Sequence, residues 1–281
     1  AGSPVAFQVT ARKSKLYHSD AIAERLYNAM GAGPSTPSPQ LFVVRMHRDI
    51  CEISADSSGD LLHRRGYRQA VTKAPMRETL AAALLLAADW NGTTPLMDPL
   101  CGSGTVVIEG ALLARRMAPG AQREFAFTRW PDFDTTAWRR QLDEASAGAM
   151  ARAPVPIFGS DRDAGAIAMA RANAERAGVS ADIEFSRTPL SAIQPPRGPG
   201  LLATNPPYGV RASAGSDLRD LYATLGNVAR ERCAGWRVAL LTPNARLSAQ
   251  TQLPLKPVAR TANGGIRVAI SVAEVRGARP P

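Results

Sequence analysis

The spacing of hydrophobic positions changes at about residue 75. Before that point, short apolar strands and one amphipathic helix follow the order β-α-β-β. The expected elements are residues 5–11, 19–30, 41–47 and 50–56. Four elements are few for an independent core, so this segment is predicted to belong to a larger α+β domain whose beginning is absent.

From residue 76 onward, helical patterns alternate with short apolar strands. This alternation predicts a parallel, doubly wound sheet. The expected strands are residues 95–98, 155–161, 182–187, 200–204, 236–243, 257–262 and 266–275. The last two flank an Asn-Gly-Gly turn, which predicts an antiparallel hairpin. The expected fold class is therefore α/β, with a Rossmann-like sheet of seven strands preceded by a partial α+β domain.

Composition then divides the chain into a partial domain at 1–57, a basic linker at 58–75 and a large α/β domain at 76–281. An insertion bearing Trp and Arg interrupts the large domain at 117–154. In the linker, basic residues flank Tyr67: Arg64, Arg65, Arg68 and Lys73. Two interpretations stand side by side, a solvated connector and a strip that contacts looped RNA through phosphates and an aromatic ring.

The net charge of +10 and the pI of about 10.2 favour a polyanionic partner, above all nucleic acid. A GC-rich source would enrich arginine too. The three cysteines are far apart, which argues against a disulfide framework and fits a reducing cytoplasm. No apolar run has the length of a membrane span. No histidine follows residue 63, so neither a Ser-His-Asp hydrolase nor a His-ligated metal is expected in the large domain.

The first candidate motif is the glycine-rich stretch 97–105, MDPLCGSGT, between a predicted strand and a predicted helix. Gly102 and Gly104 let a ligand approach the backbone at the helix N-terminus. The stretch lacks the Lys of a P-loop and the third glycine of a dinucleotide fingerprint. Asp98 repels phosphate but can hold an ammonium group, which favours S-adenosylmethionine over NAD.

The second motif is an acidic strand end. Asp161 follows the next predicted strand, where an acidic side chain can bind ribose hydroxyls. Asp163 is the alternate, and N-cap of the following helix is an equally good interpretation for it.

The third motif is Asn205-Pro206-Pro207-Tyr208, at the end of the strand 200–204. The side-chain oxygen of Asn205 and the carbonyl of Pro206 could accept hydrogen bonds from an amine on a planar ring. The prolines fix the backbone, and Tyr208 could stack on the ring face. A strand-end turn with Tyr208 packed inward is the alternative.

These motifs together resemble one family over almost the whole chain. The stretches 58–68, 97–112 and 204–211 closely resemble the THUMP-domain RNA guanine-N2 methyltransferases, in particular the large-subunit ribosomal RNA methyltransferases of the L (KL) type. Many relatives carry the label N6-adenine-specific DNA methylase because they share the Asn-Pro-Pro-Tyr motif. The resemblance implies a class I methyltransferase fold, S-adenosylmethionine as cofactor and a partial THUMP-like RNA-binding domain at 1–57.

Residue by residue, the resemblance implies a cofactor site with Asn205 at its edge and a catalytic motif at 205–208, while a set of basic residues forms separate candidates for contact with the RNA backbone. The cofactor residues are Asp98, Pro99, Cys101, Gly102, Gly104, Thr105, Asp161 and Asp163. The basic residues are Arg64, Arg65, Arg68, Lys73 and Arg211. One departure stands out: Arg187 and Thr188 occupy the place of an acid that contacts the cofactor adenine in relatives.

Taken with the residues above, the resemblance implies a cytoplasmic enzyme that forms N2-methylguanine in structured RNA, most of all 23S rRNA, with no metal and no membrane partner. Guanine-N2 methylation of tRNA, adenine-N6 methylation of DNA or RNA, and methylation of a protein glutamine are alternatives within the same chemistry. The Arg187-Thr188 departure supports a further alternative, a non-catalytic RNA-binding assembly factor.

Overall fold

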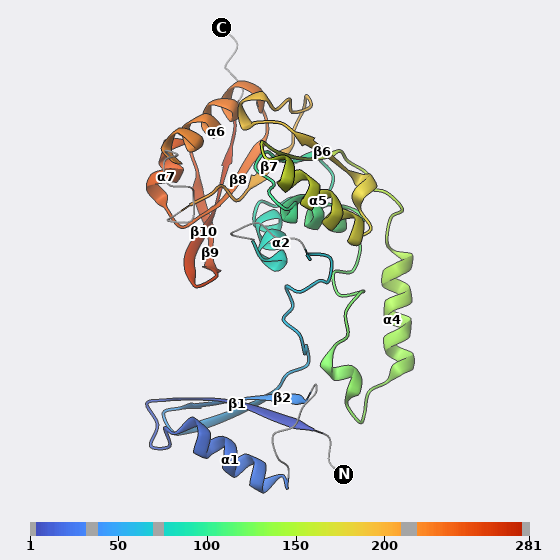
Figure 1. Ribbon diagram of the computed structural model, residues 1–281, viewed down its shortest axis with the longest axis vertical. Helices are drawn as coiled ribbons and strands as arrows, with labels where there is room; N and C mark the ends of the chain where they lie inside the picture. The colour runs from blue at the N-terminus through green and yellow to red at the C-terminus, as the bar shows by residue number, and fades with distance from the viewer. Residues whose placement is uncertain (1–3, 32–38, 70–75, 209–217, 277–281) are drawn as a thin grey trace. The chain divides into compact units, whose positions relative to one another are not determined.

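The computed structural model describes four parts of the chain, residues 4–31, 39–69, 76–208 and 218–276 (Figure 1). The chain divides into two compact units. Unit 1 comprises Ala1–Leu62 and Arg123–Arg140, and unit 2 comprises His63–Gln122 and Gln141–Pro281. Helix α4 (Thr135–Ala147) lies inside the predicted insertion at 117–154, and its residues belong partly to unit 1 and partly to unit 2.

Unit 1 contains the predicted β-α-β-β order. Its sheet has the order β1-β2-β3, with β1 and β2 parallel and β3 antiparallel. The elements are β1 (Val5–Arg12), α1 (Ser19–Ala29), β2 (Gln40–His47) and β3 (Ile50–Ala55). Arg48 and Asp49 join the last two strands with φ angles of 50° and 62°, as a two-residue type I′ turn requires.

Unit 2 contains the predicted seven-stranded sheet, in the order β6-β5-β4-β7-β8-β10-β9. β10 runs antiparallel to both of its neighbours, β8 and β9, and the other pairs of described strands in this sheet are parallel. In chain order the strands are β4 (Leu96–Asp98), β5 (Ile157–Asp161), β6 (Ile183–Arg187), β7 (Leu201–Thr204), β8 (Arg237–Thr242), β9 (Lys256–Asn263) and β10 (Ile266–Glu274). The doubly wound α/β class is therefore confirmed.

Helices cover both faces of this sheet (Figure 1). One hydrophobic cluster joins the sheet to three helices, α2 (Glu78–Ala87), α3 (Thr105–Ala114) and α5 (Ala164–Arg176). A second cluster joins the other face to α6 (Leu218–Arg232), against which α7 (Ala245–Gln250) packs. Helix α7 was not predicted from the sequence, because its six residues are too few to show a helical period of hydrophobic positions. Within the described residues, no helix combines the length and apolarity needed to cross a membrane.

The strand order reverses at β4, which lies between β5 and β7. Because parallel strands end at the same edge, the residues that follow β4, β5 and β7 meet there. In open α/β sheets, ligands bind in the crevice at such a switch point. The fold thus brings the three sequence motifs to one place.

Candidate active site

Two left-handed glycines shape the loop between β4 and α3. Gly102 has a φ of 52° and Gly104, the N-cap of α3, a φ of 85°. A Cβ on Gly104 would lie 3.0 Å from the Cβ of Ala170, so both the backbone angle and the space require glycine. Thr105 then begins the helix and directs the free N–H groups of its first turn to the carboxyl edge.

Hydrogen bonds from two other elements hold this loop in shape. The Cys101 N–H donates to the Ser160 carbonyl at 2.9 Å, and the Gly102 N–H donates to Asp161 Oδ2 at 3.1 Å. From α5, Asn173 Nδ2 donates to the Ser103 carbonyl at 3.0 Å. Asn173 is fully buried, and the sequence analysis did not predict it as a residue that supports the site. A polar amide on the apolar face of the predicted helix could have indicated this role.

Asp98 is a buried carboxyl at the end of β4. The Leu100 N–H donates to its Oδ1 at 3.1 Å. Burial raises the pKa of Asp98 to about 7, against the opposing effects of the Thr204 hydroxyl and the Leu100 N–H, and the Asp161 charge raises it further. A cation placed beside Asp98 would favour its charged form, so the group is suited to an ammonium ligand.

Asp161 and Asp163 have different local roles. Asp161 ends β5, and its Oδ1 accepts from the Asp163 N–H at 3.0 Å. Asp163 is the N-cap of α5, with its Oδ1 accepting from the Gly165 N–H at 2.8 Å. The N-cap interpretation is confirmed, and ligand contact by Asp163 stays a prediction. Ser160 Oγ is buried and has no hydrogen-bond partner among the described residues.

The side-chain oxygen of Asn205 is a buried acceptor directly after β7. Oδ1 has no partner within the described part of the chain. Leaving a buried acceptor unpaired costs about 1–3 kcal/mol, so this position favours a ligand that brings an N–H donor. Pro206 beside it is buried, whereas Pro207 is exposed.

Tyr208 has a hydrogen-bond partner that was not predicted from the sequence. Its hydroxyl accepts a hydrogen bond from Asn263 Nδ2 at 3.0 Å, and its ring packs on the cluster under α2 and α3. The ring is half-buried, which combines features of both interpretations of Tyr208. Asn263 belongs to the Asn-Gly-Gly stretch, which the sequence marked only as a turn.

The residues around the end of β6, where the sequence departs from the expected acid, make side-chain hydrogen bonds to other described residues. Arg187 Nε donates to the Arg162 carbonyl at 3.3 Å. The Thr188 hydroxyl donates to Ser186 Oγ at 3.0 Å. Contact between Thr188 and a cofactor adenine stays a prediction. Across the described residues, no group of three His, Cys, Asp or Glu side chains is placed to hold a metal ion.

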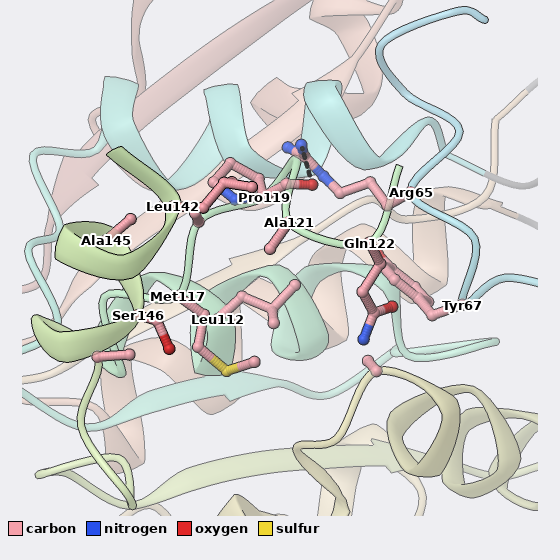
Figure 2. A pocket seen from close by; sticks show the side chains of 13 residues that line it. Arg65, Tyr67, Leu112, Met117, Pro119, Ala121, Gln122, Leu142, Ala145 and Ser146 are labelled. Atoms are coloured by element: carbon pink, nitrogen blue, oxygen red, sulfur yellow. Dashed lines mark hydrogen bonds between the residues drawn. The ribbon is translucent and has the colours of Figure 1, made fainter. Parts of the chain in front are cut away.

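A cavity of about 150 Å³ lies elsewhere in unit 2, between the last turns of α3 and α4 (Figure 2). Leu112, Met117 and Leu142 line it with apolar surface, and Arg65 borders it. It lies at the end of α3 opposite the glycine loop, and none of the motif residues lines it. This cavity is therefore separate from the switch-point site.

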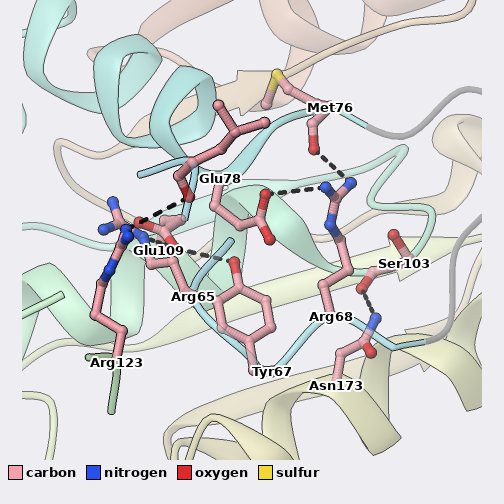
Figure 3. Close-up of polar contacts among 10 residues, drawn as sticks. Arg65, Tyr67, Arg68, Met76, Glu78, Ser103, Glu109, Arg123 and Asn173 are labelled. Carbon is pink, nitrogen blue, oxygen red and sulfur yellow. Dashed lines mark hydrogen bonds and ion pairs between the residues drawn. The ribbon is translucent and has the colours of Figure 1, made fainter. Parts of the chain in front are cut away.

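The linker residues around Tyr67 are part of the core (Figure 3). Arg65 Nε and the buried Tyr67 hydroxyl each donate to Glu109 Oε1 at 2.9 Å. Arg68 pairs with the buried Glu78 at 2.9 Å. The solvated connector is therefore wrong for this part of the linker. Tyr67 is only 3% exposed and both guanidinium groups are used in buried pairs, which disfavours the RNA strip, and RNA contact by these residues stays a prediction.

The same network reaches the glycine loop. Arg176 on α5 donates from Nε to the Tyr67 carbonyl at 2.8 Å and also bonds Asn173, which holds Ser103. Of the other basic candidates, Arg64 is exposed, and Lys73 and Arg211 lie outside the described residues.

The fold and this site define a Rossmann-like class I methyltransferase. This assignment rests on the sheet order, on the glycine loop after β4 and on the Asn-Pro-Pro-Tyr motif after β7. Residues 65–266 match the family described as RMKL-like, methyltransferase domain. The match covers well over half of the chain, so the protein belongs to this family.

Individual relatives agree with that membership. A candidate RNA methyltransferase of Synechocystis sp., slr0064, is 36% identical over 269 residues, with 92% of this chain and 70% of that protein covered. The ribosomal RNA large subunit methyltransferase K/L of Allochromatium vinosum is 42% identical over 260 residues. That alignment covers 88% of this chain, which spans only 35% of the relative.

A solved structure also matches in fold. SMU.472, a candidate methyltransferase crystallised in complex with SAH, has a TM-score of 0.83 and 27% identity, with 100% of this chain and 77% of that chain covered.

Proposed function

We propose that this protein transfers a methyl group from S-adenosylmethionine to the exocyclic N2 of guanine in structured RNA, with 23S rRNA as the substrate. The observation that carries the proposal is the buried Oδ1 of Asn205 at the switch-point edge, which has no hydrogen-bond partner among the described residues. Such an acceptor suits an amine hydrogen, and the neighbouring glycine loop suits a cofactor with an ammonium group. The names of the K/L relatives support RNA as the substrate.

The residues fit the cofactor by their chemistry. Asp98 would hold its ammonium group, the loop at Gly102 and Gly104 would admit it against the backbone, and Asp161 would bind its ribose. The unpaired Ser160 hydroxyl adds a buried polar atom at the same edge. When bound, the cofactor supplies an electrophilic methyl group.

The chain's own part is to hold the target amine. A guanine N2 amine has its lone pair delocalised into the ring. An N–H donated to Asn205 Oδ1, and a second donated to the Pro206 carbonyl, would shift electron density back to nitrogen. The rigid diproline keeps these acceptors in place, so little reorganisation is needed. Tyr208, tied to Asn263, would offer a fixed ring surface to the base.

RNA binding by residues 1–57 and a cytoplasmic location complete this proposal. The first follows from the THUMP-like resemblance, and the second from the proposed rRNA substrate. Arg64, Lys73 and Arg211 remain proposed phosphate contacts, while Arg65 and Arg68 are not carried forward because of their buried pairs.

The test is to incubate the protein with unmodified 23S rRNA from in vitro transcription and methyl-labelled S-adenosylmethionine, then digest the RNA to nucleosides. Label in N2-methylguanosine supports the proposal. Label in N6-methyladenosine overturns the base, label only with tRNA overturns the substrate, and calorimetry without cofactor binding favours an assembly factor. With Asn205→Ala, we expect kcat to fall by about 100-fold or more. An unchanged kcat would overturn the role of Asn205.

A further inference from the structure

The β9–β10 hairpin extends past the edge that carries the site. β8 ends at Thr242, which pairs with Ala269 of β10, but the β9–β10 ladder continues to the pair Asn263 and Ile266. Three further residues of β10 therefore lie beyond the end of β8, a reach of about 10 Å. Since β8 runs parallel to β7, the hairpin passes the same edge at which Asn205 follows β7. Figure 1 shows the hairpin beyond the end of β8.

The hairpin tip is fixed and is joined to the catalytic motif. Gly264 and Gly265 have φ angles of 57° and 85°, which a type I′ turn requires and which few other residues adopt. Next to this turn, Asn263 donates the hydrogen bond to the Tyr208 hydroxyl. The projecting strands thus stand directly beside the proposed base-binding ring.

Two arginines lie together on the opposite face of the hairpin from Asn263. Arg260 pairs with Ala269 and Arg267 with Ala262, so their side chains share one face and are diagonal neighbours. Both are exposed, and neither makes an ion pair or side-chain hydrogen bond with a described residue. Residues 232–273 contain six basic residues and no acidic one, so no carboxylate of this segment competes for them.

We infer that the β9–β10 hairpin is an RNA-binding surface on which Arg260 and Arg267 contact phosphates flanking the target nucleotide. The inference rests on the proposed function and goes beyond it by naming where the substrate backbone lies. Two adjacent guanidinium groups that have no ion pair or side-chain hydrogen bond within the described part of the chain suit phosphate oxygens, which accept bidentate hydrogen bonds. The proposed contact is with phosphates, and it requires no base-specific hydrogen bond.

The test compares the full chain with its Arg260→Ala/Arg267→Ala variant in filter binding of unmodified 23S rRNA at several salt concentrations. Two lost phosphate contacts on a single strand make the negative slope of log K against log salt shallower by about 1.4, equivalent to roughly tenfold weaker binding at 0.15 M salt. In methylation assays, KM for RNA should rise by a similar factor with kcat retained. Arg260→Lys/Arg267→Lys should restore most of the affinity.

The matched control is Arg116→Ala/Arg197→Ala, which removes the same charge from exposed positions at the amino edge of the sheet. This control should leave the salt slope unchanged. An identical loss in both variants would overturn the hairpin as the contact and leave the methyltransferase proposal standing. So would unchanged binding in the hairpin variant. Wild-type protein that binds no RNA would overturn both proposals. Calorimetry with S-adenosylmethionine should give the same Kd for wild type and the hairpin variant, and a changed Kd would mean that the cofactor site was disturbed instead.

Discussion

The buried Asp98 carboxyl should make the stability of the ligand-free protein depend on pH. Its pKa is about 7 in the folded chain and 3.8 as an isolated side chain. Between these values the folded state holds a proton that the unfolded state has released. Stability from this group is therefore greatest at low pH and is lost as the pH rises toward 7.

The size of the loss follows from the same two pKa values. From pH 5 up to the folded pKa, a span of about two pH units, the unfolded carboxyl is ionised while the folded one stays protonated; one unit is worth about 1.36 kcal/mol, so the loss is about 3 kcal/mol. In Asp98→Asn the side chain does not titrate, and this contribution disappears. Other groups titrate alike in both proteins and cancel in the comparison.

The assay is urea denaturation of wild type and Asp98→Asn at pH 5 and at pH 8 without cofactor. The stability of the variant relative to wild type should increase by about 3 kcal/mol between the two pH values. A difference that stays constant would refute the argument, because Asp98 would then already be charged at pH 5. Saturating S-adenosylmethionine should reduce the pH effect, since an ammonium partner favours the charged form.

Two further substitutions test the support of the site. Gly104→Ala forces a φ of 85° on alanine and brings its Cβ to 3.0 Å from Ala170; we expect destabilisation of about 2 kcal/mol by urea denaturation and weaker cofactor binding by calorimetry, and wild-type values for both would contradict the reasoning. Glu109→Gln removes the carboxylate that pairs with Arg65 in the core, at an expected cost of about 3 kcal/mol. The exposed pair of Arg45 and Glu52 gives the control, where Glu52→Gln should cost under about 1 kcal/mol; equal costs would show that burial of Glu109 is unimportant.

The sheet and its switch point were predictable because their signals are local. Short apolar strands, glycines after helices and the Asn-Gly-Gly turn each act within a few residues. The strand order then places Asp98, Asp161 and Asn205 at one edge of the sheet. The sequence motifs had predicted each of these residues at the end of a strand. What could not be predicted depends on partners far along the chain. Tyr67 and Glu109 are 42 residues apart, and nothing near either one indicates the other.

The net charge alone did not indicate which part of the chain carries the excess of basic residues. From the sequence, the net charge of +10 was associated with RNA binding by the N-terminal domain. Yet unit 1 has 10 basic and 9 acidic residues, whereas unit 2 has 24 basic and 15 acidic. Because phosphate attraction follows the local balance of charge, the larger part of any electrostatic RNA affinity must come from the methyltransferase unit itself. A basic hairpin beside Tyr208 gives that charge a place to act, since phosphate contacts there would also set the position of the target base.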